Sequence, residues 1–131
     1  MDELYSRVSK ITKQALYSFM KEEDISTLNY HFRYYFDHCI DVNRIQVIPH
    51  HFSNHKIEGL TVNDSLGTSF SYEKDSPVTK RHFTLCHELG HFILKHVGTY
   101  FTESVDSQES ILEREANVFS AIVLMPDIVL L

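Results

Sequence analysis

Residues 81–96 read Arg-His-Phe-Thr-Leu-Cys-His-Glu-Leu-Gly-His-Phe-Ile-Leu-Lys-His and contain the pattern His87-Glu88-x-x-His91. On a helix, residues four apart lie one above the other, so both imidazoles can reach one metal ion. Two imidazoles make half of a tetrahedral zinc site. Glu88 lies about 100° round the helix, where its carboxylate can accept a proton from water at the open coordination position. The pattern therefore predicts a hydrolytic metal site, and its alternative is an ordinary helix that carries two histidines.

The same stretch predicts a mostly buried helix over about residues 79–96. Apolar side chains recur at mixed spacings, as they do in helices covered on several sides. They are Phe83, Leu85, Leu89, Phe92 and Ile93. Thr79 or Thr84 is a candidate cap for its start, and Gly98 is placed to follow its end.

A second helix, predicted over about residues 108–125, supplies the candidate third ligand. Its apolar stripe consists of Leu112, Ala116, Phe119 and Val123, and Pro126 ends it. Beside that stripe, Glu113 can bind the metal, while Asn117, one turn later, can hold an imidazole N–H. The alternative for Glu113 is an ordinary solvated carboxylate. Glu109 and Glu115 are better candidates for that role, since Glu115 falls on a different face.

Two blocks of sequence resemble the ImmA/IrrE family of zinc metallopeptidases. The first is Arg81-x-Phe83-Thr84-Leu85-x-His87-Glu88-Leu89-Gly90-His91, and the second is Glu113-x-x-Ala116-Asn117-x-Phe119-x-Ala121-x-x-Leu124-Met125-Pro126. The resemblance covers about residues 81–126 and is far more specific than the five-residue pattern. It implies that His87, His91 and Glu113 hold zinc in a gluzincin-like site and that Glu88 is the catalytic base.

The resemblance also implies a substrate class, a helix-turn-helix repressor of a phage or mobile element, cut at a specific site. A tetrahedral oxyanion needs a donor besides zinc, and Tyr72, His82 and Tyr100 are the candidates. The rival interpretation is a non-catalytic repressor-binding module whose metal site is structural or empty. Glu88 favours the peptidase, because a structural site needs no adjacent base.

The length and composition predict one globular domain over residues 1–131. The resemblance implies further helices after Met125-Pro126, so we expect either a shortened chain or a C-terminal tail that packs on the core. Hydrophobic residues make up 43% and charged residues 23% of the chain, which is ordinary for a globular domain. The formal net charge of −6 disfavours direct binding to nucleic acid. No apolar run is long enough for a membrane span, and no signal peptide is evident. Cys39 and Cys86 show no framework spacing, so we expect a cytoplasmic protein.

Before the metal motif, the sequence predicts two amphipathic helices over about residues 2–20 and 25–39, the second capped by Asp24 or Ser26. Three or so strands follow between residues 43 and 74, with a hairpin turn at 64–67 in which Gly67 takes a positive φ. The fold class is thus α+β, with a helical N-terminus, a small mainly antiparallel sheet and two zinc-site helices.

Two further segments have open interpretations. Residues 97–108 are polar and small, and they predict a loop that is a candidate substrate lid. His50, His51 and His55 are either a second metal site or a solvated loop. The solvated loop is favoured because no carboxylate or cysteine completes a ligand set.

Overall fold

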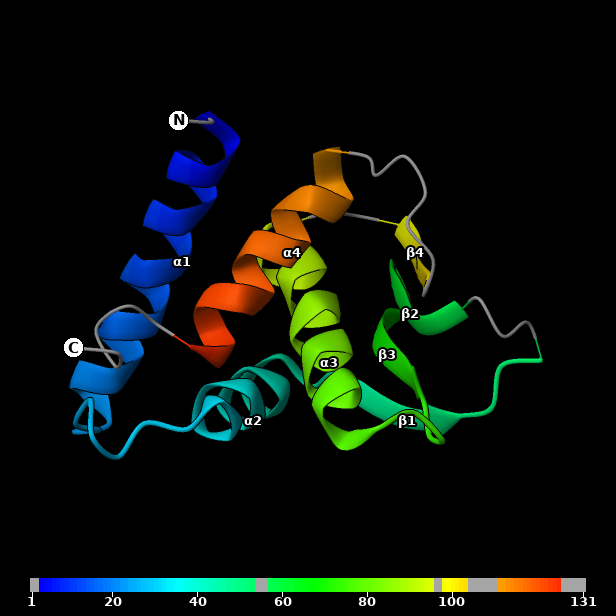
Figure 1. Cartoon of the computed structure of the whole chain (residues 1–131), viewed down its shortest axis with the longest axis horizontal. Helices are drawn as coiled ribbons and strands as arrows, with labels where there is room; N and C mark the ends of the chain where they lie inside the picture. Colours follow the sequence, from blue (N-terminus) through cyan, green and yellow to red (C-terminus); the bar gives the residue numbers. More distant parts are fainter. Residues whose placement is uncertain (1–2, 54–56, 96–97, 104–110, 126–131) are drawn as a thin grey trace.

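The computed structural model describes residues 3–53, 57–95 and 111–125 in full, and the backbone of 98–103. It contains four helices and four strands within those ranges (Figure 1). In chain order they are α1 (Glu3–Glu22), α2 (Phe32–Asn43), β1 (Gln46–His50), β2 (Ile57–Asp64), β3 (Gly67–Glu73), α3 (Val78–Ile93), β4 (Gly98–Glu103) and α4 (Ile111–Leu124).

The strands form one sheet in the order β1-β3-β2-β4. β1 runs parallel to β3, and the other neighbours are antiparallel. β2 and β3 form the expected hairpin, in which Gly67 has a φ of 130° that side chains larger than hydrogen rarely allow. The predicted α+β class and mainly antiparallel sheet are confirmed.

Residues 98–103 correct the prediction of a loop over 97–108. They form β4, an edge strand whose partner is β2, with Tyr100 opposite Thr61. The segment is rich in threonine and aromatic residues, which favour strands. It lacks the alternation of polar and apolar residues that predicts a strand half buried on one face. Residues 97 and 104–108 of the predicted lid lie outside the described residues.

The start of α2 is also later than predicted, at Phe32 instead of residue 25. The reason lies in how α1 ends. Asp24 has a φ of 54°, and Ile25 donates its N–H to the Met20 carbonyl oxygen at 2.8 Å. This is the Schellman arrangement that closes a helix C-terminus. Asp24 therefore ends α1 and does not cap α2, whose N-cap is His31.

Two smaller boundary predictions differ in the same way. No threonine caps α3, because Pro77 holds the N-cap position and makes no side-chain hydrogen bond. The helix ends at Ile93, three residues earlier than expected, and Lys95 follows with a φ of 64°.

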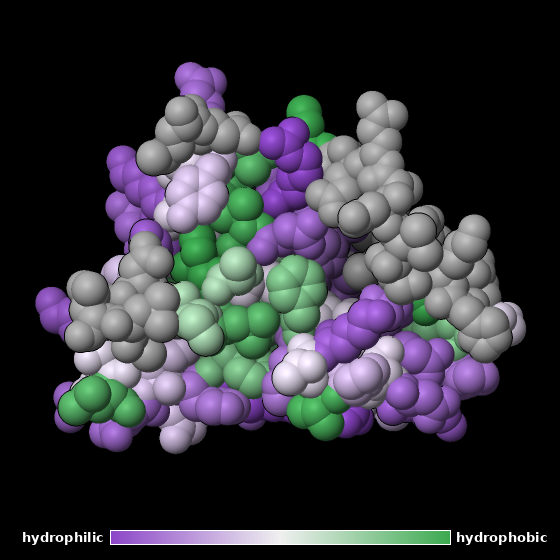
Figure 2. All heavy atoms as spheres, viewed as in Figure 1, coloured by the Kyte–Doolittle hydropathy of each residue, from purple (hydrophilic) through white to green (hydrophobic). Residues whose placement is uncertain are grey.

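The core lies where the helices meet each other and the sheet. α3 packs against both β2 and β3 on one side and against α4 on another, and α1 packs on α4 (Figure 1). Figure 2 shows apolar side chains gathered between α1, α2 and α4, with hydrophilic residues around them. The largest fully buried apolar side chains come from five elements: Val8, Leu16, Phe36, Phe70, Leu89, Phe119 and Val123.

Glu115 corrects another prediction, that it would be a solvated carboxylate. Its side chain is only 8% exposed and forms an ion pair with Arg7 of α1. The face of α4 that carries Glu115 is covered by α1, and the sequence of α4 alone does not reveal that neighbour. None of the described helices is long and apolar enough to cross a membrane. The chain terminus at 126–131 lies outside the described residues.

Candidate metal centre

The structure brings His87, His91 and Glu113 together. The two histidines lie one turn apart on α3, and Glu113 lies in the first turn of α4. His87 Nε2 is 3.1 Å from Glu113 Oε1, and His91 Nε2 is 2.8 Å from Glu113 Oε2. Both imidazoles are buried, while the Glu113 side chain remains 23% exposed. The site is therefore closed at the histidines and open towards solvent at the carboxylate.

The two helices meet closely enough for this because Gly90 has no side chain. A Cβ at Gly90 would lie 3.2 Å from the Cα of Ala116 and 3.1 Å from Cδ1 of Phe119. Ser120, fully buried on α4, donates its hydroxyl to the Phe83 carbonyl oxygen of α3 at 3.1 Å. These contacts set the position of α4 on α3, and so carry Glu113 to the histidines.

The charges of the three side chains compensate one another. Burial alone would raise the pKa of the Glu113 carboxyl, but hydrogen bonds to His87 and His91 and their charges outweigh it, and lower the pKa to about 2. Burial likewise opposes a charge on His87, but Glu113, Glu88 and Asn117 together raise its pKa. A cation held by these groups would take the place of the imidazolium proton, so binding would release a proton.

The donor set fits a zinc ion. Two imidazole nitrogens and one carboxylate are among zinc's preferred ligands, and a tetrahedral ion with ligands about 2.0–2.2 Å away keeps them roughly 3.3–3.5 Å apart. The separations of 3.1 and 2.8 Å need little adjustment to reach that spacing. The ligand atoms of the three residues all lie within 4.8 Å of one another. These residues could hold a metal ion and leave one position open.

Glu88, the predicted base, is fully buried beside the ligands. Its carboxylate points to β2, where the Thr61 hydroxyl donates a hydrogen bond to Oε2. Asn117, the predicted partner of an imidazole, lies half-buried on α4 and contributes to the raised pKa of His87. The roles expected of Glu88 and Asn117 from the sequence stay predictions.

The three candidate oxyanion donors differ in their surroundings. Tyr72 is half-buried on β3, paired with Gly59 of β2. His82 faces α2, with its ring 4.6 Å from that of Phe32, and burial together with nearby Arg33 lowers its pKa. Tyr100 lies on β4, and its side chain is outside the described part. The structure therefore places His82 against α2, while Tyr72 and Tyr100 lie on the sheet.

A second group of possible ligands surrounds His51. Its Nδ1 lies 3.5 Å from Glu73 Oε2 and 3.2 Å from Asp75 Oδ2. The sequence-based argument that no carboxylate completes a ligand set with these histidines is therefore wrong, because the fold brings Glu73 and Asp75 next to His51. Glu73 already accepts the backbone N–H groups of Phe52 and Asp75, at 2.9 and 3.0 Å. Through these hydrogen bonds, Glu73 holds together the segments that follow β1 and β3. His50 packs against Phe52, and His55 lies outside the described residues.

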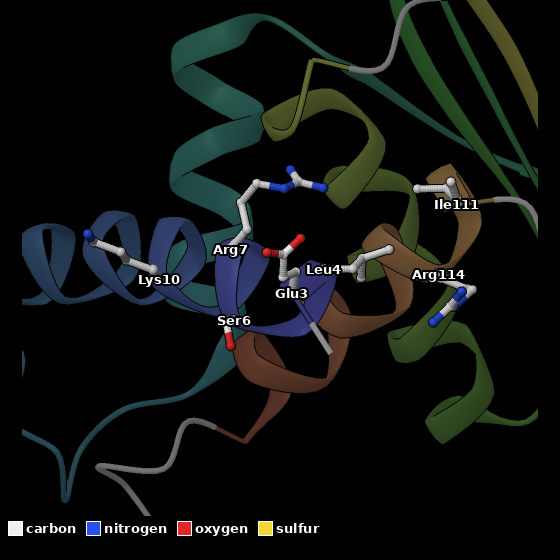
Figure 3. Close-up of a pocket in the computed structure, with 7 residues that line it drawn as sticks. All are labelled: Glu3, Leu4, Ser6, Arg7, Lys10, Ile111 and Arg114. Carbon is white, nitrogen blue, oxygen red and sulfur yellow. The ribbon is translucent and has the colours of Figure 1, made fainter. Parts of the chain in front are cut away.

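Two other features lie apart from the metal centre. Burial raises the pKa of the Cys86 thiol to about 12, and Cys86 is not among the described residues that gather at the metal centre. A cavity of about 760 Å³ lies between α1 and the start of α4 (Figure 3). It is lined by Glu3, Leu4, Ser6, Arg7, Lys10, Ile111 and Arg114. None of the predicted site residues lines it.

Sequence reasoning missed the two β2 residues that touch Glu88, namely Gly59 and Thr61. A Cβ at Gly59 would lie 3.3 Å from Glu88 Oε1. A glycine inside a strand often marks the close approach of another group, and that signal was present. Nothing in the sequence pattern distinguishes Thr61 from other strand threonines.

Residues 40–131 match the model of a peptidase family, described as the IrrE N-terminal-like domain. The match includes both helices that carry the metal centre and all four strands. It excludes α1 and most of α2. No curated protein and no solved structure matches the chain.

Proposed function

Because the chain belongs to the peptidase family of the IrrE N-terminal-like domain, we propose that it is a zinc-dependent endopeptidase. The observation that carries this proposal is the convergence of His87, His91 and Glu113 from two helices, beside a buried carboxylate at Glu88. A purely structural site would need a fourth protein ligand. Among the described residues, the group contains three.

Each protein residue has a separate role in peptide hydrolysis. When bound, zinc would polarise the scissile carbonyl and make the attacking water more acidic. Glu88 accepts the proton of that water and passes it to the leaving amine. Because Glu88 is shielded from bulk solvent, it exchanges protons with molecules inside the site. Asn117 helps to hold the His87 ring.

We infer that the substrate lies along β4. This strand is at one end of the sheet order, so one side of its backbone has no partner strand among the described residues. Exposed strand edges pair with extended peptides through main-chain hydrogen bonds. β4 neighbours β2, which touches Glu88 through Thr61. A peptide on the other edge, next to β1, would be separated from β2 by both β1 and β3.

The proposed substrate is a helix-turn-helix repressor, as the motif resemblance implies. A cytoplasmic location follows from that substrate. The second candidate function is a repressor-binding module without catalysis. The open edge of β4 serves binding equally well, so the two functions differ in what Glu88 does and in whether the metal site is catalytic, structural or empty.

A matched pair of substitutions separates these functions. Glu88→Gln and Glu113→Gln make the same carboxylate-to-amide change, one at the base and one at a ligand. The substrate is the repressor encoded beside the gene, incubated with the zinc-loaded chain, with and without a chelator. Cleavage is followed at matched zinc occupancy.

If the protein is a zinc endopeptidase, the chelator should abolish cleavage. Glu88→Gln should keep its zinc and lose about 10²–10⁴-fold in rate, since the amide cannot accept the proton. Glu113→Gln should lose zinc and activity together. Equal cleavage by wild type and Glu88→Gln would exclude the mechanism. Tight repressor binding without cleavage would favour the binding module.

A further inference from the structure

The carboxylate of Glu88 is held by β2 from two sides. Thr61, fully buried, donates its hydroxyl to Oε2. Gly59 faces the other oxygen, since a Cβ there would lie 3.3 Å from Oε1 and 3.5 Å from Cδ. Residues two apart on a strand point to the same face. This face of β2 therefore offers the carboxylate a hydroxyl at one position and a space at the next.

The space at Gly59 is necessary as well as present. The same Cβ would come within 2.6 Å of Thr84 Cγ2 on α3, closer than atoms of this kind approach without movement. Any larger residue at position 59 would press α3 and the Glu88 carboxylate away from the strand. The pairing of β2 with β4 shifts register between Ile57 and Gly59, so the strand is already irregular at this point.

The contact at Thr61 has a direct chemical consequence. A buried carboxylate is costly unless donors satisfy it, and hydrogen bonds to charged groups are the stronger ones. One donor fixed to Oε2 restricts rotation of the carboxylate about its last bond. The restriction favours one orientation of Oε1, the oxygen that lies over Gly59.

We propose that Thr61 is a positioning residue that orients Glu88 for proton transfer. This proposal rests on the proposed function, because the orientation of Glu88 affects catalysis only if Glu88 is the base. Thr61 is not among the residues that gather at the metal centre. It therefore acts on the base without altering metal binding, and loss of its hydroxyl lowers kcat while KM and zinc content stay the same.

The test compares substitutions that separate the hydroxyl from the side-chain shape. Thr61→Val keeps the branched shape and removes the hydroxyl, and Thr61→Ser keeps the hydroxyl. Thr61→Ala also removes the hydroxyl and replaces the valine variant if that variant does not fold. Thr68→Val is the matched control. This substitution removes the hydroxyl of a threonine on β3, which donates a hydrogen bond to Asn63 Oδ1 of β2 at 3.0 Å.

In repressor cleavage, Thr61→Val should lower kcat roughly 10–100-fold, since small errors of geometry cost up to about 10²-fold. Thr61→Ser should stay within about threefold of wild type. Thr68→Val should match wild type. A valine variant with the wild-type kcat, or a serine variant as slow as the valine variant, would overturn the proposal.

A second measurement needs no substrate. In protein labelled with ¹³C at the glutamate side-chain carboxyl, the Glu88 signal is the one that Glu88→Gln removes. At one fixed pH, Thr61→Val should move this signal, while Thr61→Ser and Thr68→Val should leave it near its wild-type position. An unmoved signal in Thr61→Val would refute the contact. If no repressor is cleaved by wild type, the endopeptidase fails while this spectrum still decides whether Thr61 holds Glu88.

Discussion

Gly90 of α3 lies against Ala116 of α4 so closely that a Cβ on Gly90 would be 3.2 Å from the Ala116 Cα. One residue further along each helix are His91 and Asn117. Glu113, the third residue of the candidate metal centre, lies one turn before Ala116. The distance between the helices at Gly90 therefore sets the distance between the histidines and the carboxylate.

Gly90→Ala should destabilise the protein and weaken metal binding. Alanine favours a helix interior over glycine by about 1 kcal/mol, but overpacking a filled core costs about 1–3 kcal/mol. The atoms that the new methyl group meets belong to the Ala116 backbone and to buried Phe119, so overpacking should dominate. Urea unfolding and zinc titration test this. An alanine variant that is more stable and binds zinc normally would show that the helices can separate without cost.

Gly59→Ala should also be destabilising, because a Cβ at position 59 would lie 2.6 Å from Thr84 Cγ2. We expect a loss of about 1–3 kcal/mol in the free energy of unfolding. Thr84→Ser removes the methyl group that is met. The cost of Gly59→Ala should therefore be smaller in the Thr84→Ser background than in wild type. Equal costs in the two backgrounds would place the strain elsewhere.

The helices that carry the candidate site were predictable from the sequence, but several contacts between elements were not. His87, His91 and Glu113 lie on strongly periodic helices, and both helices form close to the expected residues. The partner of Glu115, Arg7, is 108 residues away, and no local pattern encodes such a pairing. β4 depends on β2 for its backbone partners. Asp24 is a good cap by composition, but its left-handed backbone closes the preceding helix. Local rules predicted the helices and the hairpin, whereas β4 and the ion pair of Glu115 depend on contacts between elements.

Arg7→Met should lower stability by removing a charged donor from the buried Glu115 carboxylate. We expect a loss of roughly 1–3 kcal/mol in the free energy of unfolding. Lys10→Met is the matched control on the same helix, with an expected change within about 0.5 kcal/mol. Thermal or urea unfolding of both variants measures the difference. Equal effects would mean that the ion pair adds nothing beyond general surface charge.

Stability should fall in acid partly through Glu73. The backbone N–H groups of Asp75 and Phe52 hold the pKa of its carboxyl below the ordinary value of 4.5. A lowered folded-state pKa means that this stabilisation is complete above the unfolded-state pKa. It is lost as pH falls through the folded-state pKa. The stability difference between wild type and Glu73→Gln should therefore shrink from about pH 6 to about pH 3. The trend should persist in added salt, since these donors are in direct contact. A difference that is constant with pH would contradict it.

α1 gives the chain a property that its motifs do not suggest. The region that matches the family model begins at residue 40, inside α2, whereas Val8, Leu16 and Phe36 are among the most deeply buried side chains. The boundary of sequence similarity therefore passes through the hydrophobic core. Moving residues 40–131 into another scaffold would transfer the candidate metal centre without α1, the helix that packs on α4. A successful transplant of the site must supply its own replacement for α1, including a cation for Glu115.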